Sequence, residues 1–259
     1  MRRLALVALV AGLTGLSASA QAQAVASDAA DSAPSKAVLE PKAVVELFTS
    51  QGCSSCPTAD AALARLVKRD DIVALSLPVD YWDYLGWKDT LASPKFSERQ
   101  RAYGKARGDG AIYTPQVIVN GVAHVNGSDE NKIAYLVDKT SKTLAASRVS
   151  IKLSEHKNKL VVEAGSAPKG MPAKEATLWL AAISKSVTVP IERGENQGKT
   201  VTYQNVVREL IPIGMWNGTE MTVKLERQSF MRPGTDSCAV LLQEGHAGPI
   251  IGAALLKQF

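Results

Sequence analysis

Apolar positions in the first half of the chain follow two patterns, nearly continuous runs and a helical spacing. Residues 43–49 and 72–79 are nearly continuous apolar runs, which predict two buried strands. Between them, residues 57–69 carry apolar side chains at helical spacing and predict a helix. A strand, a helix and another buried strand within about 37 residues form a βαβ unit with parallel strands. A ligand site is expected at the carboxyl ends of those strands.

The next segments predict a helix, a hairpin and a further helix. A Ser-Pro pair opens a mostly polar helical segment over residues 93–107. Short apolar stretches at 116–119 and 122–125 are joined by an Asn-Gly pair, the strongest two-residue hairpin signal. A Ser-Asp cap then begins a helix over residues 128–146. The first domain is therefore predicted as β-α-β-α-β-β-α over residues 42–147.

Beyond residue 148 the apolar period changes to two, which predicts strands. Eight alternating stretches are separated by Gly, Pro and Asn turns, at 149–153, 160–163, 176–183, 187–191, 200–213, 220–226, 238–243 and 250–256. This spacing is typical of an antiparallel β-sandwich. The predicted fold class is α/β for the first domain, with a mixed sheet, and all-β for a sandwich domain over residues 148–259.

The first 24 residues have the layout of a secretory signal peptide. Arg2 and Arg3 precede an apolar run over residues 4–16, which is shorter than the roughly 18 residues needed to span a bilayer. Three overlapping small-residue cleavage signals follow, ending at Ala20, Ala22 and Ala24. Residues 25–41 are predicted to be a flexible lead-in. We therefore expect a periplasmic or secreted protein with no membrane attachment after cleavage, with a retained anchor as the alternative.

Composition and charge narrow the classes of partner. Apolar residues make up 46% and charged residues 21% of the 259, as in globular proteins. Without Arg2 and Arg3, 28 basic residues stand against 25 acidic ones, with no basic stripe that carries interleaved aromatics. Nucleic-acid binding therefore has no support. Three cysteines cannot staple a chain of this length, so its stability must come from buried apolar area.

A Cys-Ser-Ser-Cys-Pro motif lies between the first predicted strand and the first predicted helix. Backbone N–H groups and the helix dipole favour a thiolate at a helix start, and the spacing of Cys53 and Cys56 brings their sulfurs within bonding distance. Cys53, at the exposed start, is predicted to attack a partner, and Cys56 to resolve the mixed disulfide. The predicted function is thiol–disulfide exchange with a partner protein, through its thiols or disulfides and without a cofactor.

The motif together with Thr114-Pro115 before a strand, a hairpin and a helix resembles the thioredoxin fold. The segments ELFTSQGCSSCPTAD, VDYWDYLGWKD and RQRAYGKARGDGAIYTPQVIVNG are similar to a bacterial secreted thioredoxin-like family known as domain of unknown function 1223. The resemblance implies that Pro115 is cis and, with Thr114, holds the substrate chain beside the cysteines. Glu46 resembles the buried acid that lies beneath the disulfide in this fold, and the resemblance implies that it takes the Cys56 proton. The alternative is that Glu46 faces solvent at a strand edge.

Trp82, Tyr84 and Trp87 follow the second predicted strand and share the rim of the cysteines. They form either a surface that recognises a substrate or a packed loop that seats the second domain. His124 is the histidine that could approach the thiols from the predicted hairpin.

Several alternatives remain open at this point. The cysteine pair also suits copper(I), so a copper carrier is the rival function, and a non-catalytic interaction module with a permanent bridge is another. Cys238 alternates with apolar residues on one strand, which indicates a small buried side chain, with a redox or metal role as the alternative. The direction of exchange is not readable from the two serines between the cysteines.

Overall fold

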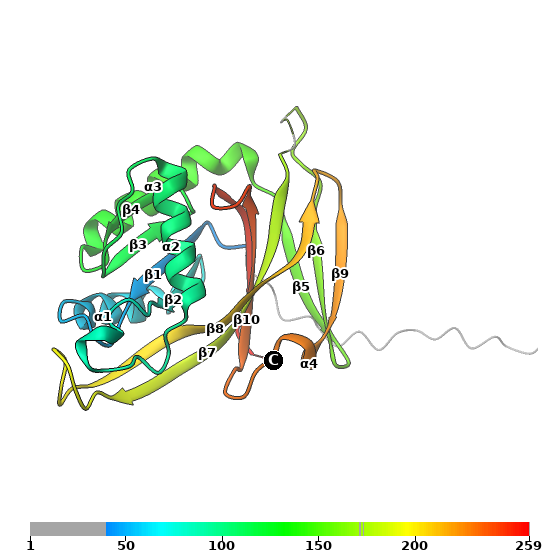
Figure 1. Cartoon of the computed structure of the whole chain (residues 1–259). Coiled ribbons are helices and arrows are strands. Elements are labelled where there is room, and N and C mark those ends of the chain that lie inside the picture. The colour runs from blue at the N-terminus through cyan, green and yellow to red at the C-terminus, as the bar shows by residue number, and fades with distance from the viewer. Residues whose placement is uncertain (1–39, 171, 173, 259) are drawn as a thin grey trace, which may run out of the picture. The chain divides into compact units, whose positions relative to one another are not determined.

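The computed structural model of the chain describes residues 40–170, 172 and 174–258 (Figure 1). The predicted signal peptide, with its cleavage signals, and residues 25–39 of the predicted lead-in lie outside these residues. The described elements, in chain order, are β1 (Ala43–Thr49), α1 (Cys56–Leu66), β2 (Ile72–Pro78), η1 (Asp83–Leu85), α2 (Pro94–Arg107), β3 (Gln116–Val119), β4 (Ala123–Asn126), α3 (Glu130–Leu144), η2 (Ala145–Ser147), β5 (Ile151–His156), β6 (Lys159–Ala164), β7 (Ala176–Pro190), β8 (Thr200–Trp216), β9 (Met221–Glu226), α4 (Arg227–Phe230), β10 (Ser237–Glu244) and β11 (Ile250–Leu256). None of these helices is long and apolar enough to cross a bilayer.

The strands form one mixed sheet and one small sheet. The larger sheet has eight strands in the order β11-β10-β7-β8-β2-β1-β3-β4, and the smaller has the order β5-β6-β9. β1 runs parallel to β2, and β2 is parallel to β8 at Ser76 and Val206. All other neighbours in both sheets are antiparallel. A mixed sheet with helices and a second small sheet is thus confirmed. The pairing of β2 with β8 places strands from before and after residue 148 in the same sheet.

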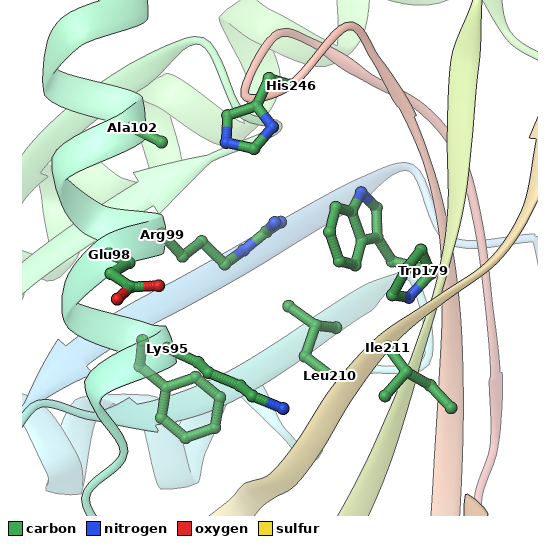
Figure 2. Close-up of a pocket in the computed structure, with 10 residues that line it drawn as sticks. Lys95, Glu98, Arg99, Ala102, Trp179, Leu210, Ile211 and His246 are labelled. Carbon is green, nitrogen blue, oxygen red and sulfur yellow. The ribbon is translucent and has the colours of Figure 1, made fainter.

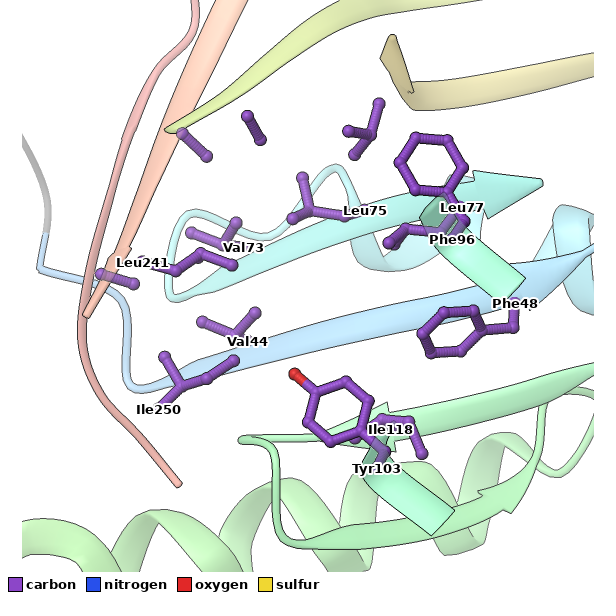
Figure 3. Close-up of a cluster of buried hydrophobic side chains, with 14 of the residues drawn as sticks. Val44, Phe48, Val73, Leu75, Leu77, Phe96, Tyr103, Ile118, Leu241 and Ile250 are labelled. Carbon is purple, nitrogen blue, oxygen red and sulfur yellow. The ribbon is translucent and has the colours of Figure 1, made fainter. Parts of the chain in front are cut away.

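The central strands β1 and β2 are buried on both faces, which explains their nearly continuous apolar sequences. On β1, Val44 and Phe48 point to the face covered by α2, where Tyr103 and its neighbours form one core (Figure 3). Val45 and Leu47 point to the opposite face, which α1 and α3 cover. Each fully buried Leu or Phe contributes roughly 1.5–3 kcal/mol, so the two faces hold β1 firmly in place. The strand therefore presents its carboxyl end, and the motif that follows it, in a fixed position.

The small sheet packs its apolar face against β7, β10 and β11. Leu153 and Val162 from β5 and β6 meet Leu178 and Val240 from the large sheet in a separate core. Cys238 belongs to this core, is fully buried and has a free thiol. Burial raises the pKa of this thiol to about 12, so it stays protonated at neutral pH. The prediction of a small buried side chain at Cys238 is confirmed.

The prediction of two strands at 176–183 and 187–191 is wrong, because these residues form the single strand β7. The polar residues 184–186 interrupt the apolar pattern, but the ladder with β8 continues through them. β7 and β8 make a long hairpin whose connecting residues, 191–199, we call the hairpin tip. The described residues after 148 therefore hold seven strands instead of eight, and the short helix α4 was not predicted.

Candidate functional site

A disulfide bond joins Cys53 and Cys56 at the carboxyl end of β1. Their Cα atoms are 5.4 Å apart, and the Cys56 N–H donates to the Cys53 carbonyl oxygen at 3.1 Å. Cys56 is the first residue of α1 and Pro57 the second, where a missing N–H leaves no helical bond unmade. Ser55 makes no side-chain cap, and the first turn contains no acidic residue. The N–H groups and the positive end of the helix dipole therefore face the sulfurs, which favours a thiolate after reduction.

Both cysteines are buried, and the residues between them are exposed. Cys53 is 2% exposed and Cys56 is fully buried, whereas Ser54 and Ser55 face solvent. The prediction of an exposed Cys53 is therefore wrong. The sequence pattern around the motif does not show which distant residues pack on this loop, and one of them is Asn196 of the hairpin tip, which donates to the Cys53 carbonyl oxygen at 2.8 Å.

The predicted Thr114–Pro115 segment lies beside the cysteine loop and is linked to it through Trp82. The Thr114–Pro115 peptide bond is cis, as predicted. Trp82 Nε1 donates to Thr114 Oγ1 at 2.8 Å, and Trp82 Cβ lies 3.0 Å from the position that a Cβ on Gly52 would take. Three segments that are separate in sequence thus meet at one end of the sheet.

The other two aromatic residues have different surroundings. Trp87 Nε1 donates to Gln51 Oε1 at 2.8 Å, and Trp87 Cβ lies 3.5 Å from where a Cβ on Gly194 would sit. Trp87 therefore packs between the cysteine loop and the hairpin tip. Tyr84 in η1 is 79% exposed, so its ring is open to a partner.

Glu46 is buried, at 1% exposure, and lies on the α2 face of β1. Its Oε1 accepts from Arg99 Nε at 2.7 Å, and its Oε2 accepts from Tyr103 Oη at 2.5 Å. Burial lowers the pKa of Arg99, but the adjacent Glu46 carboxylate outweighs this and holds that pKa above its ordinary value. Helix α1 covers the opposite face, so Glu46 belongs to an ion pair between β1 and α2. The sequence left open whether Glu46 is buried or faces solvent at a strand edge, and the buried position is confirmed.

Asp60 is an acidic residue beside the cysteines that sequence reasoning missed. It lies on α1, four residues after Cys56, and is 4% exposed. Residues four apart share one face of a helix. In the part of the chain that the structure describes, neither carboxyl oxygen has a hydrogen-bond partner of good geometry.

The surroundings of Asp60 favour its neutral form. Burial raises its pKa to about 8, the nearby Thr49 hydroxyl offsets part of this, and the negative charge of Asp89 adds to it. The pKa of Asp89 is itself raised by burial. The pKa of Tyr203 on β8 is raised by burial and by both carboxylates. The sequence signal that could have found Asp60 is its spacing of four residues from Cys56, which places a carboxyl group on the same side of α1 as Cys56, on an otherwise apolar helix face.

His124 and a cavity beside α2 lie apart from the cysteines. His124 Nδ1 is 2.9 Å from Tyr113 Oη, and its Nε2 is 3.3 Å from Asp109 Oδ2. Burial lowers the pKa of His124. A cavity of about 330 Å³ lies between α2 and the β7–β8 hairpin, lined by Arg99 and Trp179 among others and by no cysteine. Figure 2 shows how these two side chains lie. Among the residues described, no group of three or more His, Cys, Asp or Glu side chains is arranged to hold a metal ion.

Comparisons with known proteins show a family and two similar structures. The crystal structure of an Agrobacterium tumefaciens protein is 37% identical and has a TM-score of 0.75, and the match covers 85% of this chain and 96% of that one. HBP35 of Porphyromonas gingivalis is 16% identical with a TM-score of 0.58, over 86% of this chain and 77% of that one, and shares the fold alone. No curated protein matches the chain. A model of proteins of unknown function, DUF1223, matches residues 44–243, and the chain belongs to that family.

Proposed function

We propose that this chain is an exported thiol–disulfide oxidoreductase that acts on another protein through Cys53 and Cys56. The observation that carries the proposal is the disulfide at the first turn of α1, beside the Thr114–Pro115 segment. A bridge between residues three apart closes too small a loop to stabilise a chain of this size much. A bond that adds so little stability, placed where a helix start favours thiolate, suits reversible exchange.

The proposal includes a thioredoxin-like domain over residues 42–147 and a β-sandwich formed by the later strands. In support, β1, α1 and β2 form the βαβ unit expected from the sequence, and the cysteines follow β1 directly. The small sheet packs face to face with β7 and β10, as the two layers of a sandwich do.

In the proposed reaction, the reduced protein attacks a disulfide of its partner. The Cys53 thiolate bonds to one partner sulfur, the partner S–S bond breaks, and the released sulfur takes a proton. A buried acid, in the fraction of molecules in which it is ionised, then takes the Cys56 proton, and Cys56 attacks Cys53 Sγ. The Cys53–Cys56 bond forms as the bond between Cys53 and the partner breaks, the second partner sulfur takes a proton, and the partner leaves as a dithiol. The pair is oxidised by two electrons and the partner is reduced by two, and the reverse sequence oxidises a partner dithiol.

We assign the transfer of the Cys56 proton to Asp60. Asp60 lies one helical turn from Cys56, has no hydrogen-bond partner of good geometry among the described residues and has a pKa of about 8, which suits proton exchange near neutral pH. Glu46, the acid expected from the sequence, has both oxygens bound to Arg99 and Tyr103 on the other face of β1. Its part in proton transfer remains a prediction, and the variants Asp60→Asn and Glu46→Gln separate the two.

The proposed partner surface surrounds the disulfide. Thr114 and Pro115 lie on one side, with Trp82 between them and the cysteine loop. Tyr84 offers an exposed aromatic ring at the same rim, and Trp87 supports the loop from behind through Gln51. Aromatic side chains supply large contact area at low entropic cost, which suits recognition of an extended partner segment.

The experiment is turnover of a protein disulfide, the reduction of insulin by dithiothreitol, with and without the purified chain. We expect acceleration by the native protein, none by Cys53→Ser, and an accumulated mixed disulfide at Cys53 in Cys56→Ser. Cys238→Ala is the matched control, because its thiol is buried elsewhere and its loss should leave turnover unchanged.

Three results would refute the proposal, and the last two would favour one of its alternatives. Full turnover by Cys53→Ser would remove the assigned nucleophile. Absent turnover, with tight binding of copper(I) against a competing chelator, would favour the copper carrier. Absent turnover with a bridge that resists strong reductants would favour the interaction module.

A further inference from the structure

The hairpin tip is hydrogen-bonded directly to the loop that carries the disulfide. Asn196 Nδ2 donates to two backbone carbonyl oxygens, at 2.9 Å to Gln51 and at 2.8 Å to Cys53. Asn196 is fully buried, and its Oδ1 accepts from Lys199 Nζ at 2.8 Å, which fixes the orientation of the amide. In Figure 1 the tip, drawn in yellow between β7 and β8, lies at the same end of the sheet as α1. A segment more than 140 residues away in sequence therefore covers the cysteine loop.

Two further contacts hold the tip on this loop. The Ser54 N–H donates to Glu195 Oε2 at 3.3 Å, and Gly194 packs against Trp87. The tip is also bonded within itself, since the Gly198 N–H donates to the Ile191 carbonyl oxygen at 2.8 Å and the Ile191 N–H to the Lys199 carbonyl oxygen at 2.9 Å. These bonds tie the two ends of the tip to each other.

The contact between the hairpin tip and the cysteine loop affects how a thiol can reach the disulfide. An attacking thiolate must reach a sulfur of the pair, yet Cys53 is 2% exposed and Cys56 is fully buried. A small thiol needs little room, whereas a protein dithiol must bring its own backbone beside the cysteine loop. The hairpin tip is bonded to the backbone of that loop at Cys53 and at Ser54.

We propose that the hairpin tip is a lid over the disulfide, with Asn196 as its latch, and that its opening decides whether a partner protein reaches Cys53. This inference rests on the proposed function, because it describes access to the same disulfide. The two hydrogen bonds to carbonyl oxygens are neutral and are replaced by water when the lid opens, so the closed state is favoured only modestly. Asn196 is a positioning residue, which acts through the backbone of the cysteine loop.

The test compares two reductants of different size on the oxidised full chain. The rate of reduction of the Cys53–Cys56 bond is measured by mass spectrometry with dithiothreitol and with reduced bacterial thioredoxin as a protein dithiol. In each case a reagent thiolate attacks Cys53 Sγ, the Cys53–Cys56 bond breaks, and Cys56 takes a proton. The second reagent thiol then loses its proton and attacks the first reagent sulfur, the bond to Cys53 breaks, Cys53 takes a proton, and the reagent leaves as a disulfide. Loss of the two latch bonds should raise the rate with the protein dithiol roughly tenfold.

Two variants and one control make the result decisive. Asn196→Ala removes the latch, and Asn196→Asp keeps its size but cannot donate to the carbonyl oxygens. Thr202→Ala is the matched control, because it removes an exposed contact with Thr188 on the same hairpin, where the two hydroxyl oxygens are 2.9 Å apart. We expect both Asn196 variants to react faster with the protein dithiol, a smaller change with dithiothreitol, and no change in Thr202→Ala.

The outcomes that would refute the lid differ from those that would refute the proposed function. Equal protein-dithiol rates in the native chain and in both folded Asn196 variants would overturn the lid. Equal acceleration with both reagents would also overturn it, since that shows general loosening of the cysteine loop. A size-dependent response without turnover of insulin in any variant would support the lid and refute the oxidoreductase.

Discussion

Replacing Asp60 with Asn tests whether a titratable acid is buried beside the cysteines. Asp60 is 4% exposed, and burial raises its pKa from 3.8 to about 8. The folded chain therefore keeps a proton on Asp60 across a pH range in which the unfolded chain has released it. Asparagine has the same shape but does not titrate, so the variant removes this difference between the two states.

The sign and size of the effect follow from the two pKa values. The folded-state pKa of this acid is raised, so the contribution of Asp60 to stability is greatest below pH 4 and is lost as pH rises from about 4 to about 8. The slope is about 1.4 kcal/mol per pH unit, which gives a loss of about 3 kcal/mol between pH 5 and pH 7. Asp60→Asn should lack this loss and should exceed the native chain in stability at pH 8.

Urea unfolding at pH 5, 6, 7 and 8 measures the effect. The quantity of interest is the difference in unfolding free energy between Asp60→Asn and the native chain, because groups shared by both proteins largely cancel. The exposed Asp138 on α3 supplies the control variant Asp138→Asn, which should follow the native curve. Parallel curves for Asp60→Asn and the native chain from pH 5 to pH 8 would refute the burial of a titrating Asp60.

Two other substitutions test packing elsewhere in the fold. Glu46→Gln leaves the buried Arg99 without a compensating charge, so urea unfolding should show a loss of about 3–5 kcal/mol, while Glu130→Gln at an exposed pair should show little change. A loss as small as that of Glu130→Gln would contradict the buried ion pair. Gly121→Ala should lower the thermal midpoint and lose more than about 1 kcal/mol, because Gly121 has a φ of +71° and its Cβ would lie 2.3 Å from the Gly248 carbonyl oxygen. An unchanged midpoint would show that this turn does not pack against the loop after β10.

Local patterns in the sequence predicted those parts of the fold that depend on local causes. β1 and β11 begin and end where their apolar stretches do, because neighbouring strands and both core faces bury them fully or nearly so. The Asn120-Gly121 pair gave the β3–β4 hairpin, since both residues adopt the positive φ that the turn requires. The cis bond before Pro115 came from resemblance to a known fold.

Contacts between distant segments could not be predicted in this way. The pairing of β2 with β8 and the bond from Asn196 to Cys53 join residues more than 100 positions apart. Periodicity along one segment carries no information on which distant loop covers it. Asp60 was missed for a different reason, since the helical pattern of α1 was interpreted through its apolar residues only and the buried polar position was passed over.

Redox titration of the cysteine pair tests the central claim most directly. The chain is equilibrated with glutathione buffers of increasing ratio of reduced to oxidised form, and each cysteine is assigned by alkylation and mass spectrometry. The account predicts one two-electron transition in which Cys53 and Cys56 change together, while the buried Cys238 stays an unmodified thiol. The midpoint potential then indicates the direction of exchange. A bridge that remains intact in every buffer, or two cysteines that titrate independently, would contradict the account.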